Sequence, residues 1–209
     1  MYLFTRSGRF RPGAVRESMA FVQAVTEKVR QESDLDVHAW LATMSPEAGT
    51  CTWAAWASSL TELEVANDKL AVSDAFNDIV EKGSSLFAGP VTDGLASLIS
   101  GEIDPAAPVP AYVGVTRAVA ANGHVSGAVT AGVEIAEAAS RITGVGTAFL
   151  VDATGPFGGC SWVTGHADIA ALQASEEALQ ADDSWMALID RIGDRYAPGA
   201  TQAIYRRVT

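Results

Sequence analysis

The sequence predicts an α+β protein in which one set of strands and helices occurs twice. Cys51-Thr52-Trp53 recurs as Cys160-Ser161-Trp162, an offset of 109 residues (51 to 160). Residues 101–110, between the halves, contain three prolines, which favour extended backbone and predict a linker. With 48% hydrophobic residues the chain can bury a core, which excludes a disordered protein. Further matches are Gly49 with Gly158, Leu63 with Leu172, Asp74 with Asp183 and, at an offset of 111, Thr5-Arg6 with Thr116-Arg117.

In the first half, Val15 and Met19 follow the spacing of a helix that begins near Pro12, where a missing N–H is not needed. Pro46 and Gly49 lie between two apolar runs, which is typical of a hairpin. A long helix follows, with Thr61 or Ser59 as its cap. The elements of this half are expected at residues 2–5 (strand), 12–32 (helix), 37–44 and 50–57 (strands), 61–86 (helix) and 91–99 (strand).

The second half has the same order. Its first helix is rich in Ala, Val and Gly, so it can pack closely on several sides. Pro156 and Gly158 predict the hairpin turn, and Asp168 can cap the long helix that follows. The elements are expected at residues 112–116 (strand), 125–141 (helix), 146–153 and 159–165 (strands), 168–196 (helix) and 200–208 (strand).

The order β-α-β-β-α-β is that of the ferredoxin-like unit, which places both helices on one face of a four-stranded antiparallel sheet. The strand over 37–44 is apolar on both faces, so its other face must also be covered. We therefore expect two ferredoxin-like repeats, 1–100 and 111–209, joined by the proline-rich linker 101–110. Their sheets are expected to pack face to face as a pseudo-dimeric α/β barrel.

The doubled hairpin with Trp53 and Trp162 resembles the dimeric α/β-barrel superfamily, with the dimer fused into one chain. That superfamily includes antibiotic-biosynthesis monooxygenases, small haem-degrading enzymes, polyketide cyclases and NIPSNAP-type proteins. The resemblance implies the fold and no single activity. Related haem-degrading proteins use a histidine on the second long helix, and neither 61–86 nor 168–196 contains one. We therefore expect no prosthetic group.

Candidate catalytic residues are His38, in a predicted strand, and His166, which follows one, because a histidine at the end of a barrel can act as an acid or base. Either could instead be a packed or loop residue. No spacing typical of a metal site is present, so no metal is expected. The candidate ligand-binding residues are Arg6, Trp40, Trp53, Arg117, Phe149 and Trp162, with a plain core role as the alternative for the tryptophans.

Arg6, Arg9, Arg11 and Arg16 form the one local cationic cluster, which could hold an anionic ligand or be a solvated face. The net charge of −11 argues against nucleic acid as a partner. No apolar run is long enough to span a membrane, the N-terminus lacks the pattern of a secretory signal, and there are only two cysteines, so a cytoplasmic protein is expected.

Three functions remain open. The leading one is a small-molecule-binding barrel without a prosthetic group, for a small apolar or aromatic ligand, assembled as a homodimer. The alternative is a cofactor-free monooxygenase or cyclase acting on an aromatic or polyketide-like substrate. The third is a structural or assembly protein. Whether the protein is an enzyme is not decided by the sequence.

Overall fold

Each half of the chain folds into antiparallel strands with helices packed on one face. The computed structural model describes residues 1–209 and divides into two units. Unit 1 comprises Met1–Leu95 with Arg206–Thr209, and unit 2 comprises Ala96–Tyr205. No helix is both long and apolar enough to cross a membrane.

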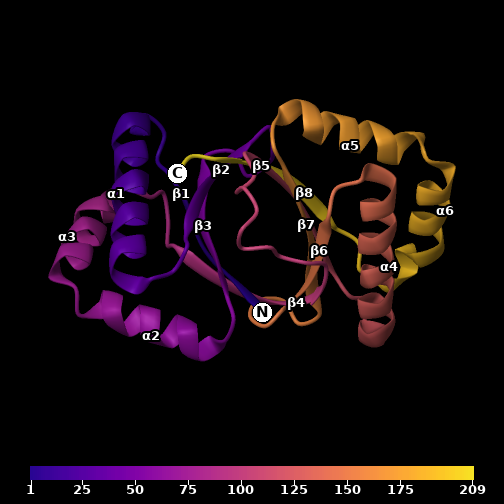
Figure 1. Cartoon of the computed structure of the whole chain (residues 1–209), viewed down its shortest axis with the longest axis horizontal. Helices are drawn as coiled ribbons and strands as arrows, with labels where there is room; N and C mark the ends of the chain where they lie inside the picture. The colour runs from indigo at the N-terminus through magenta and orange to yellow at the C-terminus, as the bar shows by residue number, and fades with distance from the viewer. The chain divides into compact units, whose positions relative to one another are not determined.

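In unit 1 the strand order is β4-β1-β3-β2, and helices α1, α2 and α3 lie on one side of these strands (Figure 1). Val22 and Val25 of α1 and Trp53 of β3 are buried between the helices and the sheet. The last residues of the chain lie beside β2, where Val208 N–H donates to Ala39 O. The elements are β1 (Tyr2–Arg9), α1 (Val15–Ser33), β2 (His38–Thr43), β3 (Thr50–Ala57), α2 (Leu60–Ala71), α3 (Asp74–Gly83), η1 (Ser84–Leu86) and β4 (Thr92–Ser100).

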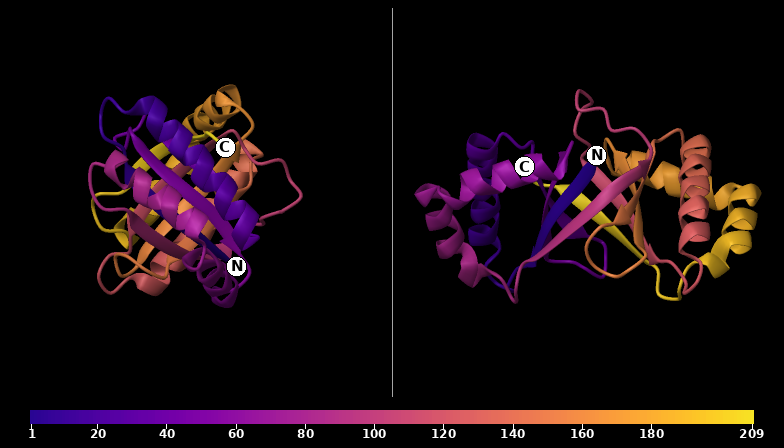
Figure 2. Two further views of the ribbon diagram at one scale, coloured as in Figure 1. Left: turned by 90° about the vertical axis from the view of Figure 1, so that its left-hand side faces the viewer. Right: turned by 90° about the horizontal axis from the view of Figure 1, so that it is seen from below.

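In unit 2 the order is β8-β5-β7-β6, and α4, α5 and α6 cover one face of these strands (Figure 2). Residues Ala96–Ser100 of β4 belong to this unit and pair with β6. Ile135 of α4, Phe149 of β6 and Trp162 of β7 are central to the core. The elements are β5 (Tyr112–Val119), α4 (Val125–Thr143), β6 (Thr147–Asp152), β7 (Gly159–His166), α5 (Ile169–Ala181), α6 (Asp183–Ile192), η2 (Gly193–Arg195) and β8 (Thr201–Arg207).

Each unit has an internal backbone hydrogen bond at the corresponding place. Ala88 N–H donates to Arg9 O, and Ala197 N–H donates to Val119 O, each at 2.8 Å. The predicted order of strand, helix, two strands, helical segment and strand is confirmed in both halves of the chain. The expected face-to-face packing of the two sheets and the domain limits stay predictions.

The two long helices expected at 61–86 and 168–196 are wrong, since each is two helices. Ser73 Oγ accepts from Phe76 N–H, and Asp182 Oδ1 accepts from Trp185 N–H. Both residues are N-caps with extended backbone, which ends one helix and starts the next. The apolar pattern runs across the break because both helices pack on the same side of the sheet.

The sheet register corrects one part of the sequence repeat. Arg6 lies opposite Trp53 in the β1–β3 pair, and Thr116 lies opposite Trp162 in the β5–β7 pair. Thr116, and not Arg117, is therefore the counterpart of Arg6. The first strands are also longer than predicted, because pairing with β3 and β7 extends them to Arg9 and Val119.

Candidate functional site

A cavity of about 230 Å³ lies in unit 1 where β1 leads into α1. Phe10, Met19 and Leu41 supply apolar wall, while Arg9 and Arg11 line the cavity and are exposed to solvent. We call this the unit 1 cavity. It joins an apolar interior to a cationic entrance.

The wall of the unit 1 cavity is fixed to the core. Phe10 N–H donates to Gly49 O of the β2–β3 hairpin at 3.0 Å. The Phe10 ring stacks on Phe87 with centroids 5.0 Å apart, and Phe87 in turn packs edge-on against Phe21 and Trp53. The aromatic wall is therefore preformed and does not depend on a bound molecule.

The two arginines differ in how they are held. Arg11 Nε donates to Phe87 O at 2.9 Å, which fixes the guanidinium beside the cavity. Arg9 makes no side-chain hydrogen bond or ion pair. Two guanidinium groups that no carboxylate neutralises, in a chain of net charge −11, make this entrance attractive to an acid group.

Ser18 of α1 also lines the cavity and carries a buried hydroxyl with no partner. Its residue is 2% exposed and Oγ makes no hydrogen bond. Other buried hydroxyls on this helix donate to the carbonyl four residues back, as Thr26 does to Val22 at 2.7 Å and Ser33 does to Val29 at 2.7 Å. A buried hydroxyl without such a bond is uncommon and calls for an explanation.

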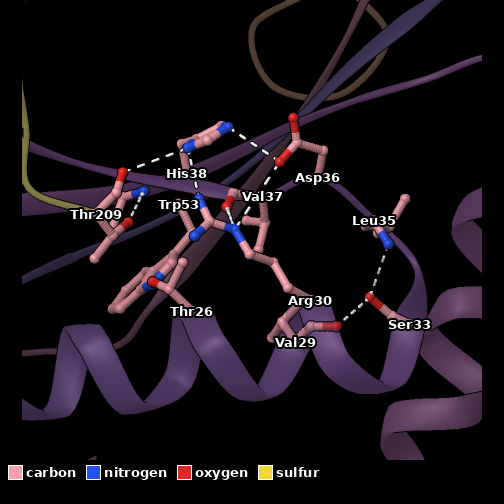
Figure 3. Close-up of polar contacts among 11 residues, drawn as sticks. Thr26, Val29, Arg30, Ser33, Leu35, Asp36, Val37, His38, Trp53 and Thr209 are labelled. Atoms are coloured by element: carbon pink, nitrogen blue, oxygen red, sulfur yellow. Dashed lines mark hydrogen bonds and ion pairs between the residues drawn. The ribbon is translucent and has the colours of Figure 1, made fainter. Parts of the chain in front are cut away.

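His38, a predicted catalytic residue, lies at the start of β2 in a polar cluster with Arg30 and Asp36 (Figure 3). Arg30 donates through Nε to Val37 O at 2.7 Å and through Nη2 to His38 Nδ1 at 2.6 Å. Because a guanidinium can only donate, this contact makes Nδ1 an acceptor and places the ring proton on Nε2. The longer contact of Nδ1 with Thr209 O, at 3.4 Å, would need the opposite tautomer and is the weaker of the two.

The other side of the His38 ring faces Asp36. Nε2 lies 3.1 Å from Asp36 Oδ1, but the two groups are not aligned as a hydrogen bond. In this arrangement Nδ1 is occupied by Arg30 and Nε2 is a hydrogen-bond donor. The geometry suits an orienting donor, and the catalytic role of His38 stays a prediction.

His166, the second predicted catalytic residue, is in unit 2 at the end of β7 and is 5% exposed. Its Nε2 lies 3.2 Å from Thr164 Oγ1, and its Nδ1 is buried without a partner. Burial lowers the pKa of His166 below its ordinary value of 6.5, so the ring is neutral in the folded state at neutral pH.

The predicted aromatic ligand-binding residues are buried. Trp53 Nε1 donates to Thr26 Oγ1 at 3.1 Å, and Trp162 Nε1 donates to Gly132 O at 2.8 Å. Phe149 is fully buried against Trp162, with ring centroids 5.3 Å apart. Trp40 of β2 is also buried. Both indole donors are therefore satisfied inside the core of their own unit.

The two predicted ligand-binding arginines contact neighbouring strands. Arg6 Nε and Nη2 donate to the two carboxylate oxygens of Asp93 at 2.7 and 2.8 Å. Arg117 Nη2 donates to Tyr205 Oη at 3.1 Å. Of the eight residues expected at a site, Phe149 and Trp162 contact each other, and none of the eight lines the unit 1 cavity.

All ten residues that line the cavity were missing from that expected set, among them Arg9, Arg11 and Ser18. Arg9 and Arg11 were noted only as part of the cationic cluster, and the Pro12-Gly13 turn after them was the available signal, since it directs α1 back across the end of β1. Ser18 gave no signal, because its sequence position does not reveal that its hydroxyl lacks a partner.

The structure contains no group of three or more histidine, cysteine, aspartate or glutamate residues that could hold a metal ion. Burial raises the pKa of Cys51 to about 12 and that of Cys160 to about 11. Both thiols are therefore protonated at neutral pH and are poor nucleophiles.

No known protein-family profile matches the sequence, and no curated protein sequence matches it. Solved structures do resemble it. A "Putative monooxygenase" from Fusobacterium nucleatum superposes with a TM-score of 0.74 at 10% identity, covering 100% of this chain and 92% of the other. A "putative monooxygenase" from Lactobacillus acidophilus gives 0.65 at 8% identity, covering 100% and 94%. An "anthrone oxidase-like protein" gives 0.68 at 11% identity, covering 100% and 91%.

The similarity to these three proteins extends over the whole of this chain, so the chain shares their fold. At this level of identity the similarity shows the fold and leaves the activity to be argued from the site.

Proposed function

We propose that the protein binds a small organic acid with an apolar body, and that the unit 1 cavity is the binding site. The observation that carries this proposal is the pairing of Arg9 and Arg11 with an apolar, preformed wall in one cavity. A carboxylate is a preferred partner of guanidinium, because two parallel N–H donors match its two oxygens.

The size of the cavity limits the ligand. A cavity of about 150 Å³ is known to hold benzene. The unit 1 cavity of about 230 Å³ therefore has room for one aromatic ring with one or two substituents. The Phe10 ring and the Met19 side chain suit such a ring, since both pack well on aromatic faces.

The proposal also includes the origin of the two units, the absence of a prosthetic group, the cellular location and the assembly expected from the sequence. The two units are copies of one ancestral unit, which is supported by the caps Ser59 and Asp168 at an offset of 109 residues and by Ser73 and Asp182 at the same offset. The protein works without a prosthetic group, in the cytoplasm and as a homodimer. Size measurement by analytical ultracentrifugation tests the last point.

Binding of benzoate tests the function. Titration of the protein with benzoate, followed by calorimetry or by ligand-observed NMR, is expected to give saturable binding that weakens with salt. The double variant Arg9→Ala/Arg11→Ala should weaken binding at least tenfold. Arg16→Ala is the matched control, because Arg16 is an exposed arginine of the same cluster that does not line the cavity.

Two results would contradict the proposal. One is equal benzoate affinity in the wild type and the double arginine variant. The other is equal affinity of the wild type for benzoate and for benzyl alcohol, which has the same ring without the negative charge.

A second candidate function is a cofactor-free monooxygenase or cyclase. Two neighbours in fold carry the monooxygenase name and one the anthrone oxidase name, and His38 is held by Arg30 as an oriented donor. Oxygen uptake in the presence of anthrone tests the oxidase activity. Uptake above the uncatalysed rate that falls in His38→Ala and in His166→Ala would support it, and uptake at the uncatalysed rate would contradict it.

A further inference from the structure

We propose that the hydroxyl of Ser18 selects the ligand of the unit 1 cavity, which is an aromatic acid with a second polar oxygen at the end remote from its acid group. This inference rests on the proposed function and adds the substrate class. The arginines are exposed and Ser18 is buried, so a ligand in the cavity has one charged end near solvent and one end inside.

Unit 2 provides the comparison that supports this role. Ala128 N–H donates to His124 O in the first turn of α4, as Ser18 N–H donates to Ala14 O in the first turn of α1. Ala128 is therefore the counterpart of Ser18. No hydroxyl is present on the helix at this place in unit 2.

At the aromatic position that differs between the units, the hydroxyl is present in unit 2 and absent in unit 1. Phe10 forms an isolated β-bridge with Phe87 in unit 1, and Ala120 forms the same bridge with Tyr196 in unit 2. Tyr196 is thus the counterpart of Phe87, and its hydroxyl donates to Ala128 O at 2.7 Å.

The polar oxygen at this place comes from the protein in unit 2 and is missing in unit 1. In unit 2 Tyr196 places its hydroxyl beside the helix, where it donates to Ala128 O. In unit 1 Phe87 has no hydroxyl, and the Ser18 hydroxyl has no partner. A hydroxyl or carbonyl oxygen on the ligand would occupy this place and bond Ser18, which explains why a buried hydroxyl is kept without a protein partner.

The charged end of the site is also confined to unit 1. The counterparts of Arg9 and Arg11 are Val119 and Ala121, as their matched backbone hydrogen bonds show. Unit 2 therefore lacks both polar contacts that the ligand would use, and we assign one site per chain.

The test compares benzoate with 3-hydroxybenzoate and 4-hydroxybenzoate, which differ from it by one hydroxyl group. The wild type should bind one hydroxybenzoate about tenfold more tightly than benzoate, a difference of about 1.4 kcal/mol. Ser18→Ala should bind all three acids with the affinity that the wild type has for benzoate.

Phe87→Tyr gives an independent test. Its added hydroxyl would lie where Tyr196 places one in unit 2, so it should occupy the site of the ligand oxygen and weaken the preferred hydroxybenzoate at least tenfold. Tyr196→Phe is the matched control, since it changes the same position in unit 2 and should leave binding unchanged. Circular dichroism confirms that each variant is folded.

The outcomes separate this inference from the proposed function. If benzoate binds through the arginines but the wild type and Ser18→Ala show no preference for either hydroxybenzoate, the role of Ser18 is refuted and the acid-binding function stands. If none of the three acids binds the wild type, the proposed function fails and this inference fails with it.

Discussion

Gly132 of α4 is the position at which the core of unit 2 is most sensitive to one added methyl group. A Cβ built there would lie 2.1 Å from the Cζ atom of Phe149, which is fully buried in β6. The same residue accepts the indole N–H of Trp162 through its carbonyl at 2.8 Å. Phe149 and Trp162 also pack on each other, so the ring of Phe149 has little room to move.

We predict that Gly132→Ala destabilises the protein by about 2 kcal/mol. Forcing a methyl group into a packed core costs up to about 3 kcal/mol, and at 2.1 Å the overlap is severe. Alanine is favoured over glycine inside a helix by about 1 kcal/mol, which offsets part of this cost. Urea unfolding followed by circular dichroism measures the difference from the shift in midpoint.

Gly127 provides the control in the same helix. A Cβ there would meet Arg195 Nη1 at 3.2 Å, the mobile end of a long side chain. Gly127→Ala is therefore expected to raise stability by up to about 1 kcal/mol. If Gly132→Ala is as stable as the wild type, or if adding Phe149→Leu to it restores none of the lost stability, the packing argument is wrong.

Three other predictions concern buried polar groups. Because burial lowers the pKa of His166 below 6.5, the unfolded chain binds a proton before the folded protein does as the pH falls. The stability of the folded protein should therefore decrease below about pH 6.5. In His166→Phe the urea midpoint should depend less on pH between pH 5 and 8 than in the wild type. Cys51 and Cys160, with pKa values raised to about 12 and about 11, should resist iodoacetamide at pH 8 in the native protein and react in urea, as mass spectrometry would show. Trp53→Phe should cost about 1–2 kcal/mol in urea unfolding, since it loses the hydrogen bond to Thr26 and leaves a small void; an unchanged midpoint would contradict the role of that bond.

The order of elements could be predicted because strong local signals mark it. The hairpin strand expected at 50–57 coincides with β3, and the helix start expected at residue 125 coincides with that of α4. The prediction failed where two local signals point to different structures. Leu70 and Phe76 continue the apolar pattern of one long helix, while Ser73 between them is an N-cap that ends one helix and begins the next.

The site was less accessible to prediction, because its features depend on contacts between distant segments. His38 was singled out as an acid or base by residue type, yet its tautomer is set by Arg30, eight residues earlier on a different element. The unit 1 cavity needs the end of β1, the start of α1 and the β2–β3 hairpin together. Only the cationic residues of its entrance were visible in the sequence.

The comparison of the two units separates what the fold requires from what is free to vary. The backbone bridges Phe10–Phe87 and Ala120–Tyr196 are the same, so the turn into the first helix of each unit is set by main-chain bonding that many side chains allow. At this turn Tyr196 donates to Ala128 O in unit 2, whereas in unit 1 the corresponding residue is Phe87 and the Ser18 hydroxyl is unpaired. If both arrangements served stability alone, that of Tyr196 and Ala128 would be the better one, because it leaves no buried hydroxyl unpaired. The arrangement of Phe87 and Ser18 leaves one unpaired, in the unit whose cavity is lined by two arginines without carboxylate partners. It is therefore better explained by a ligand than by packing.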